Sequence, residues 1–174
     1  ITCRDWSSDV CSSDLRVSAA NFFSNLGTPT RVANNLLQLK FTNTASELAR
    51  FLTNSTFGLA GLFDPAAKWG LEKKDEDLGQ TLGHYGIGQG FYLVLPVLGS
   101  TSLRDGVGRI GDHFVDPLPS ALKSEELAGL RALDAENAIS LDKDTYEGIR
   151  ENELDPYLFV RDAYTQMRAG KVRK

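Results

Sequence analysis

Residues 78–103 form a stretch of 26 residues without one Asp, Glu, Lys or Arg, in a chain whose charged fraction is 24%. At the charged fraction of the whole chain, an ordinary surface segment of 26 residues would carry about six charges. The stretch also holds six glycines, and Gly83, Gly86, Gly88 and Gly90 would break a transmembrane helix at its middle. We therefore expect backbone that is buried in protein or lies at membrane depth beside a cavity. The alternative is a buried loop and strand in a soluble core.

Length and composition are those of an ordinary globular chain. Of its 174 residues, 41% are hydrophobic, so disorder is not expected and one domain can bury a core. The net charge is -4 and the basic cluster is confined to residues 171–174, which argues against a nucleic-acid partner. Residues 1–15 lack an apolar core flanked by basic residues, so no signal peptide is recognised there.

Residues 1–14 do not read like the rest of the chain. They repeat Ser-Ser-Asp and hold both cysteines, Cys3 and Cys11. They resemble a translated sequencing-adapter read, so the cysteines carry no functional argument. We predict that residues 1–14 are not native, pack against nothing and contribute nothing to function, and that residues 15–174 are a helical domain truncated at its N-terminus.

Signals for helix starts recur along the chain. A Ser, Thr or Asp before a helical run can cap it, and a following Pro, or a Glu or Gln three residues later, strengthens the signal. These signals place helix starts near Thr44, Asp64, Asp77 and Asp155 and at Ser100 or Thr101. Residues 21–26 predict an aromatic-rich turn. Residues 91–95 fit either a short extended segment or a buried helical turn.

Two of the expected helices carry a regular apolar face. One face consists of Ala45, Leu48, Ala49 and Leu52, and the other of Leu103, Val107, Ile110 and Phe114. No Asn-Gly hairpin signal is present. We predict a mostly α fold, built as a single domain of short, bent helices.

Glycine is concentrated in one part of the sequence. Twelve of the 16 glycines lie between Gly58 and Gly111, although each costs about 0.5–1 kcal/mol relative to Ala inside a helix. We expect Gly106, Gly108 and Gly111 to allow tight helix packing. Bent helices that form the wall of a pore would use such close approach and positive φ together.

The chain offers little that predicts catalysis. Residues 86–90 lack the Gly-x-Gly-x-x-Gly spacing and the preceding strand of a dinucleotide site. His84 and His113 are expected at helix ends or on the surface, and Ser100, Asp105 and His113 form a triad only on paper. We predict no catalytic residue, no cofactor, no metal site and no nucleic-acid partner.

A long series of short motifs runs through residues 21–26, 35–38, 50–58, 61–64, 79–83, 86–88, 92–96, 103–105 and 155–164, with Arg168. In this order and spacing the series resembles the MlaA (VacJ) family of outer-membrane phospholipid-transport lipoproteins. The resemblance implies a ring-like, membrane-embedded wall around a central amphipathic channel. Phospholipid misplaced in the outer leaflet of the outer membrane would pass through this channel to a periplasmic carrier, and no reaction would be catalysed.

The resemblance also implies partners and a location. The family associates with trimeric porins, passes lipid to the soluble carrier MlaC, and lies lipid-anchored in the periplasmic leaflet of the outer membrane. This chain departs from the family at Phe91 and Leu78. We expect the family's signal sequence and lipidated cysteine to belong to a part that precedes this sequence. The alternative function is a soluble helical hydrolase of lipid esters that uses His84 or His113.

The residues expected to line the lipid channel combine neutral polar groups with apolar ones. They are Gln80, His84, Tyr85, Gly86, Ile87, Gly88, Gln89, Gly90, Tyr92 and Leu93. A wall without fixed charge suits lipid tails, because a bare charge at bilayer depth is costly. Gly86 and Gly88 are the predicted hinge points, since glycine tolerates positive φ without strain.

Overall fold

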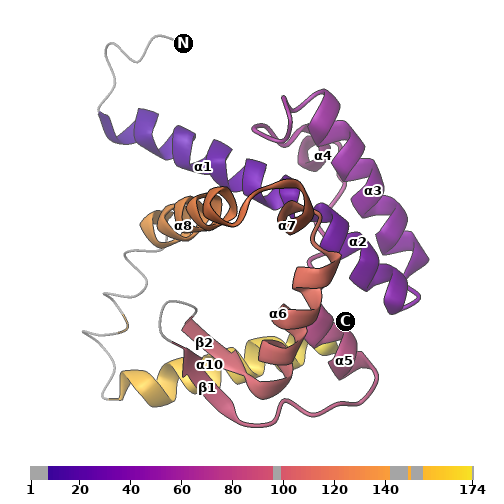
Figure 1. The fold of residues 1–174 in the computed structure, drawn as a ribbon, viewed down its shortest axis with the longest axis vertical. Helices are drawn as coiled ribbons and strands as arrows, with labels where there is room; N and C mark the ends of the chain where they lie inside the picture. The colour runs from indigo at the N-terminus through magenta and orange to yellow at the C-terminus, as the bar shows by residue number, and fades with distance from the viewer. Residues whose placement is uncertain (1–7, 96–98, 142–148, 150–154, 174) are drawn as a thin grey trace. The chain divides into compact units, whose positions relative to one another are not determined.

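The computed structural model describes residues 8–95, 99–141, 149 and 155–173, and most of them are helical (Figure 1). The prediction of a mostly α fold is therefore confirmed. Backbone contacts divide the chain into two compact units, each described by itself below. The predicted ring around a channel remains a prediction.

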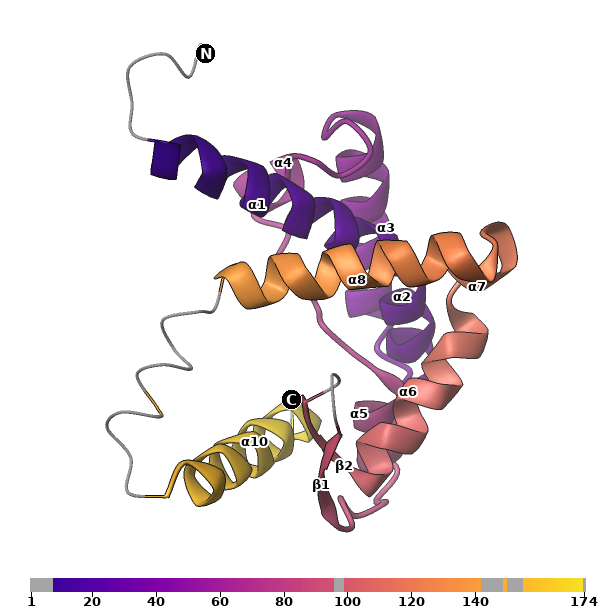
Figure 2. The same ribbon diagram turned by 60° about the vertical axis from the view of Figure 1, so that its left-hand side comes forward.

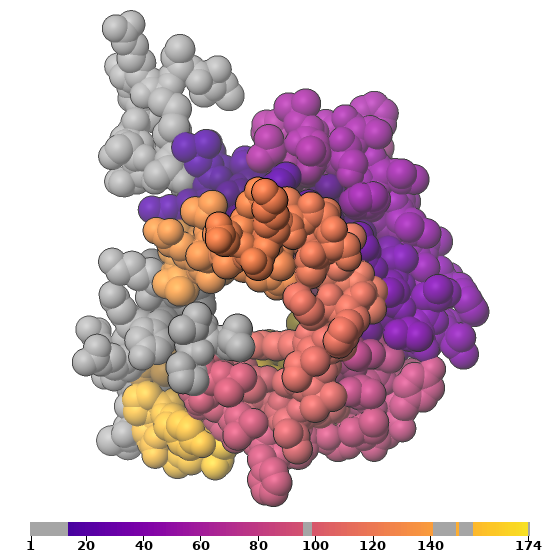
Figure 3. Space-filling view, in the orientation of Figure 1, coloured from indigo at the N-terminus to yellow at the C-terminus, as the bar shows by residue number. Residues whose placement is uncertain are grey.

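The first unit comprises residues 8–28, 45–73 and 118–141 of the described chain. It contains α1 (Ser8–Leu26), most of α3 (Phe41–Thr56), α4 (Pro65–Lys68), α7 (Leu118–Ala121) and α8 (Ser124–Leu141). Helix α8 lies along α1, and in the space-filling view its residues cover part of that helix (Figure 3). The turn predicted at residues 21–26 is wrong, because α1 continues through them.

The second unit comprises residues 29–44, 74–117 and the described residues from 149 onward. Its elements are most of α2 (Thr28–Leu37), α5 (Leu78–His84), β1 (Tyr92–Leu95), β2 (Gly99–Ser102), α6 (Leu103–Val115) and α10 (Pro156–Val172). The strands pair antiparallel with Tyr92 opposite Ser102 and Leu95 opposite Gly99. The extended alternative for residues 92–95 is therefore the one that forms. The hairpin lies beside α6 and α10 (Figure 2).

Three of the predicted helix starts are confirmed. Asp64, Asp77 and Asp155 precede α4, α5 and α10, and each carboxylate accepts a hydrogen bond from a backbone N–H in the first turn. The start at Thr44 is wrong, because α3 begins at Phe41 and the Thr44 hydroxyl donates to the Lys40 carbonyl instead. The cap of α6 is Ser102, whose hydroxyl accepts from the Asp105 N–H, and Ser100 and Thr101 precede it in β2.

Helices α5 and α6 meet through glycine. A Cβ atom on Gly108 would lie 2.4 Å from the Gly79 backbone nitrogen, and one on Gly111 would lie 2.1 Å from Leu78 Cδ2. The predicted tight packing is thus confirmed for Gly108 and Gly111. At Gly106 a Cβ would meet nothing within 4 Å. Small residues at a helix interface let two backbones approach closely, as in helix pairs that pack within lipid.

The polarity of the interior is inverted relative to that of a soluble protein. Within the described ranges, Ala66 is the one hydrophobic residue classed as buried, whereas many buried residues are polar or charged. Helix α3 buries Glu47, Arg50 and Asn54. Its predicted apolar face exists but is exposed, with Leu52 63% accessible.

No helix among the described residues is both long and apolar enough to span a bilayer. The exposed apolar residues are instead distributed over short helices, turns and the hairpin of both units.

We predict that Gly108→Ala lowers the free energy of unfolding by about 1–3 kcal/mol, because its methyl group would press on the Gly79 backbone. Chemical denaturation in detergent, followed by circular dichroism, measures this. Gly106→Ala is the matched control on the same helix and should be neutral or stabilising. Equal effects of the two substitutions would contradict the proposed close packing of α5 and α6.

Candidate functional site

The uncharged segment consists of the partly buried helix α5, an exposed turn and both strands of the hairpin. In α5, Gly79, Gln80 and Thr81 are buried. Residues 84–88 are exposed, so of the two expected alternatives, burial of the whole segment in protein does not hold. A position of these residues at membrane depth stays a prediction.

Glycines shape the turn, as the sequence predicts. Gly86, Gly90 and Gly99 have positive φ values of 89°, 69° and 73°. Gly88 is not among the positive-φ glycines, so the backbone argument for a hinge does not apply there. A Cβ on either Gly86 or Gly88 would meet nothing within 4 Å, which leaves φ as the difference between the two positions.

The start of α6 holds this turn in place. The Arg104 N–H donates to the Gln89 carbonyl at 3.2 Å, and Arg104 Nη1 donates to the Ile87 carbonyl at 3.3 Å. The Leu103 N–H donates to the Phe91 carbonyl at 2.9 Å. Three bonds from consecutive residues thus fix the turn while its apolar side chains stay exposed.

The predicted channel residues divide into two sets. The exposed set is His84, Tyr85, Gly86, Ile87, Gly88, Gly90 and Leu93. The side chains of the other set are tied within unit 2: the Gln80 amide donates to Asp75 and Asp77, the Gln89 amide to the Thr165 carbonyl, and the Tyr92 hydroxyl pairs with Ser100. The exposed set can contact a ligand without breaking an internal hydrogen bond of its own side chain, with the exception of Tyr85, which donates to the Leu37 carbonyl.

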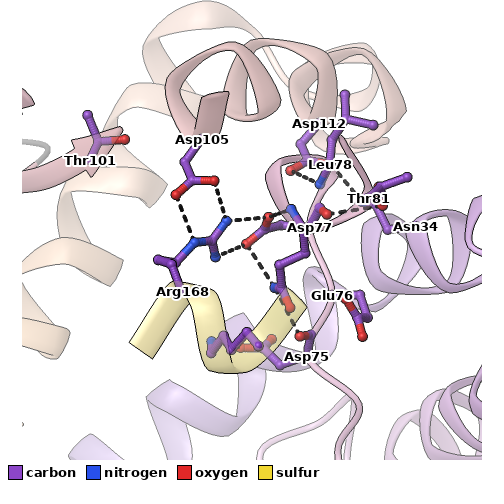
Figure 4. A network of polar contacts seen from close by, with 12 residues as sticks. Asn34, Asp75, Glu76, Asp77, Leu78, Thr81, Thr101, Asp105, Asp112 and Arg168 are labelled. Atoms are coloured by element: carbon purple, nitrogen blue, oxygen red, sulfur yellow. Dashed lines mark hydrogen bonds and ion pairs between the residues drawn. The ribbon is translucent and has the colours of Figure 1, made fainter. Parts of the chain in front are cut away.

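A cluster of charges joins α10 to the starts of α5 and α6 (Figure 4). The Arg168 guanidinium of α10 binds two carboxylates in bidentate fashion. It donates to both oxygens of Asp77 at 2.6 and 2.8 Å and to both oxygens of Asp105 at 2.8 Å. Because Asp77 caps α5 and Asp105 lies in the first turn of α6, one side chain joins three helices.

The charges in this cluster stabilise one another. Burial by itself would raise the pKa of Asp77 and of Asp105, but the bonds from Arg168 outweigh it and lower both below the ordinary value near 3.8. Burial would lower the pKa of Arg168, yet the two carboxylates raise it. The pKa of Tyr164 is raised, mainly by burial and in addition by its hydrogen bond to Asp105. In that bond the Tyr164 hydroxyl donates to the carboxylate at 2.6 Å.

A second polar cluster joins α2 to α5. The Asn34 amide donates to Asp112 at 2.7 Å, and the Thr81 hydroxyl donates to the Asn34 carbonyl oxygen at 3.0 Å. The Gln38 amide donates to Glu76 and to Thr81. Burial raises the pKa of Asp112, although its carboxylate also accepts from the Leu78 backbone N–H.

The sequence analysis does not predict that these polar and charged side chains come together between the helices. Asp77 was recognised as a cap and Arg168 as part of a family motif, but nothing local shows that the two meet, since they lie 91 residues apart. The one available signal is the spacing of Tyr164 and Arg168, which at i and i+4 share a face of α10. That face could not be assigned a partner without the fold.

Both histidines lie at helix ends, as predicted. His84 is in the last turn of α5 and His113 in the last turn of α6, and both are exposed. Asp105 accepts bonds from Arg168, Tyr164 and Arg104, so its carboxylate is used to bind cations and a phenol. This geometry does not support the triad of Ser100, Asp105 and His113.

Comparison with known proteins relates the chain to one family. A family model described as MlaA lipoprotein matches residues 6–171. The chain is 35% identical over 162 residues to an uncharacterized protein of Rickettsia typhi, covering 91% of this chain and 64% of that protein. It is 35% identical over 159 residues to the intermembrane phospholipid transport system lipoprotein MlaA of Escherichia coli K12, covering 87% of this chain and 61% of that protein.

A solved structure shows a similar fold. It comes from work on the structural basis for maintenance of bacterial outer membrane lipid asymmetry, and it matches with a TM-score of 0.80 and 31% identity. The match covers 97% of this chain and 83% of the other. The chain spans somewhat less than two thirds of the length of the curated relatives named above.

We predict that Arg168→Met lowers the free energy of unfolding by about 3–5 kcal/mol, because it leaves the buried Asp105 carboxylate without its main partner. Urea denaturation in detergent measures this. Arg161→Met on the same helix is the control, since Arg161 forms an exposed pair with Asp162 worth about 0–1 kcal/mol. Equal losses would show that the cluster does not hold the helices together.

We predict that stability falls as the pH drops below about 4. Asp77 and Asp105 have lowered folded-state pKa values, so their contribution is complete above the unfolded value near 3.8 and is lost as the pH falls through the folded values. Asp112 has a raised pKa and acts in the opposite direction. Denaturation at stepped pH checks this, and Asp77→Asn, which keeps a capping side chain, should flatten the dependence.

Proposed function

Since the chain belongs to the MlaA lipoprotein family, we propose that it binds phospholipid at the outer membrane of a Gram-negative bacterium. In this proposal it withdraws phospholipid misplaced in the outer leaflet and passes it toward the periplasm, which maintains the lipid asymmetry of the membrane. The name of the Escherichia coli relative, an intermembrane phospholipid transport system lipoprotein, supports this function. The similar solved structure supports it as well, because that structure comes from work on the maintenance of outer membrane lipid asymmetry.

The inverted polarity is the observation that carries the proposal. In water, it is unfavourable to expose large apolar side chains such as Phe91 (78% exposed) and Phe114 (83% exposed). Burying an ion pair such as Arg168 with Asp105 also costs free energy, because both charges lose their hydration. In lipid, apolar surface is solvated by acyl chains, and polar groups must find their partners inside the protein. The described residues follow the second pattern in both units.

The lipid route that we propose uses the exposed turn of residues 84–90 with Leu93. Its neutral polar groups and apolar side chains match a molecule with a polar head and apolar tails. Behind it, Arg104 and the Arg168 cluster keep the charges bonded to one another. A route without exposed fixed charge would let a head group pass without being trapped.

The finer parts of the proposal rest on the family resemblance. They are the lipid anchor, the position in the periplasmic leaflet of the outer membrane, the association with trimeric porins and the transfer of lipid to the carrier MlaC. We also propose that the chain catalyses no reaction. Release of fatty acid from phospholipid by the purified protein, lost on His84→Ala, would favour the hydrolase alternative.

A chimera tests the function. Residues 15–171 of this chain would replace the matching region of the Escherichia coli relative, in a strain that lacks its own copy. We predict that the chimera lowers the phosphatidylethanolamine on the cell surface, measured with a membrane-impermeant amine reagent, to the level of the parent strain. A chimera that reaches the outer membrane, resists protease and leaves surface lipid unchanged would contradict the proposal.

Two substitutions in the chimera test the turn. Gly86→Val should raise surface phosphatidylethanolamine, because valine is strained at a φ of 89° and would change the path of the turn. Gly88→Val is the matched control, since its Cβ also has free space and its φ is not positive. Equal effects would remove the conformational role of Gly86.

A further inference from the structure

The exposed turn begins as the cap of a helix. Tyr85 is the C-cap of α5, and Gly86, which follows it, has a φ of 89°. The Gly86 N–H donates to the Gly83 carbonyl at 3.0 Å, and the Ile87 N–H donates to the Leu82 carbonyl at 3.0 Å. This pair of bonds is a Schellman motif, which ends a helix at a left-handed glycine. The positive φ of Gly86 is therefore required by the helix end and does not by itself indicate a hinge.

The guanidinium of Arg104 lies beside the end of α5, in space that a glycine leaves free. An ideal Cβ on Gly83 would lie 2.7 Å from Arg104 Nη1 and 2.7 Å from Val172 Cγ2. A larger residue at position 83 would therefore displace one of these two side chains. The Arg104 side chain is only 5% exposed, so a charged group is buried beside a turn that carries no charge of its own.

Arg104 uses its hydrogen-bond donors unevenly. Its Nε donates to Asp105 Oδ1 at 3.1 Å, and its Nη1 donates to the Ile87 carbonyl at 3.3 Å. No described residue accepts a hydrogen bond from its Nη2, although that atom is buried. A buried N–H without a partner costs free energy, so the hydrogen bonding of Arg104 itself does not explain why its guanidinium lies there. The position does achieve one thing, which is to hold the turn by the Ile87 carbonyl next to the backbone bond at Gln89.

We propose that Arg104 is a positioning residue, whose side chain holds the turn of residues 84–90 in one conformation as a fixed wall of the lipid route. The inference rests on the proposed function and deepens it, because it assigns the conformation of the route to one buried side chain. Arg104 acts through the backbone carbonyls of the turn and does not contact the lipid. In this proposal Gly86 serves as a helix cap and not as a hinge.

The positioning of the turn can be separated from the stability of the fold. Without Arg104, the Asp105 carboxylate keeps its bonds from Arg168 and from Tyr164. The Ile87 carbonyl belongs to an exposed turn, where water can replace the lost donor. A methionine at position 104 would also remove the buried donor that lacks a partner. Arg104→Met should therefore lower the free energy of unfolding much less than Arg168→Met does.

The first arm of the experiment measures hydrogen exchange of the full chain in detergent by mass spectrometry. The Gly86 and Ile87 amides are bonded within the turn, so their exchange reports its opening. Peptides that cover residues 84–91 should exchange about tenfold faster in Arg104→Met, because a bond from a charged group is lost. Peptides of α10 should be unchanged. Arg161→Met, which removes an exposed guanidinium from α10, is the control and should leave the turn as it is.

Gly83→Ala tests the same contact without removing the charge. Its methyl group should displace the flexible end of Arg104 and so release the Ile87 carbonyl. The same increase in exchange is expected over residues 84–91. Gly170→Ala is the matched control, because Gly170 lies on α10 of the same unit and its Cβ meets nothing within 4 Å.

The second arm measures transport in the chimera described above. Arg104→Met and Gly83→Ala should each raise the phosphatidylethanolamine on the cell surface, because a turn that is no longer held does not keep the shape of the route. The amount of chimera in the outer membrane and its resistance to protease should not change. Arg161→Met and Gly170→Ala should leave surface lipid at the level of the unaltered chimera.

The outcomes separate this inference from the proposed function. Unchanged exchange over residues 84–91 in both variants would overturn the positioning role, and so would faster exchange without a rise in surface lipid. A loss of stability in Arg104→Met as large as in Arg168→Met would assign Arg104 to the fold instead. If the unaltered chimera fails to lower surface lipid, the proposed function fails, whereas the exchange arm still decides whether Arg104 holds the turn.

Discussion

The second unit depends on one guanidinium. Arg168 binds Asp77 and Asp105 at once, and these carboxylates belong to the start of α5 and the first turn of α6. Four charge-assisted bonds of 2.6–2.8 Å set the positions of three helices, which in a soluble protein would be set by apolar side chains. Tyr164, Arg104 and Ser102 complete the hydrogen bonding of Asp105. The bonds around Arg168 and Asp105 favour a single arrangement, because a shift of either side chain leaves a buried charge unpaired.

Glycine packing and polar bonding act together around this cluster. Gly79 and Gly108 let α5 and α6 approach until their backbones touch, which brings Asp105 within reach of Arg168. Neither feature needs water to be expelled from apolar surface, so both can operate where the surroundings are lipid. The apolar side chains of these helices are then free to face outward. Polar bonds and glycine contacts hold the helices together, and the exposed apolar side chains remain available for contact with lipid. Such contact does not require a bilayer-spanning helix, and none is found among the described residues.

The exposed turn is held by the same framework. Arg104 binds the carbonyls of the turn with its backbone and side chain, and its neighbour Leu103 begins the apolar face of α6. Arg104 also binds Asp105, so the turn is tied to the Arg168 cluster, while a lipid that contacted the turn would meet mainly neutral and apolar atoms. The cluster stabilises the site while the side chains of Arg168 and Asp105 stay buried.

Local chemistry in the sequence determined much of the secondary structure. The caps at Asp64, Asp77 and Asp155, the bend glycines at Gly86 and Gly90 and the apolar face of α6 all follow from spacing over a few residues. The start of α3, the helical continuation of α1 through residues 21–26 and the hairpin did not follow from it, since tertiary contacts overrode weak local preferences. The direction of each apolar face, and the meeting of Arg168 with Asp77 across 91 residues, were decided by the tertiary structure alone. The reason is physical: periodicity shows that a helix has two faces, but only packing shows which of them meets protein.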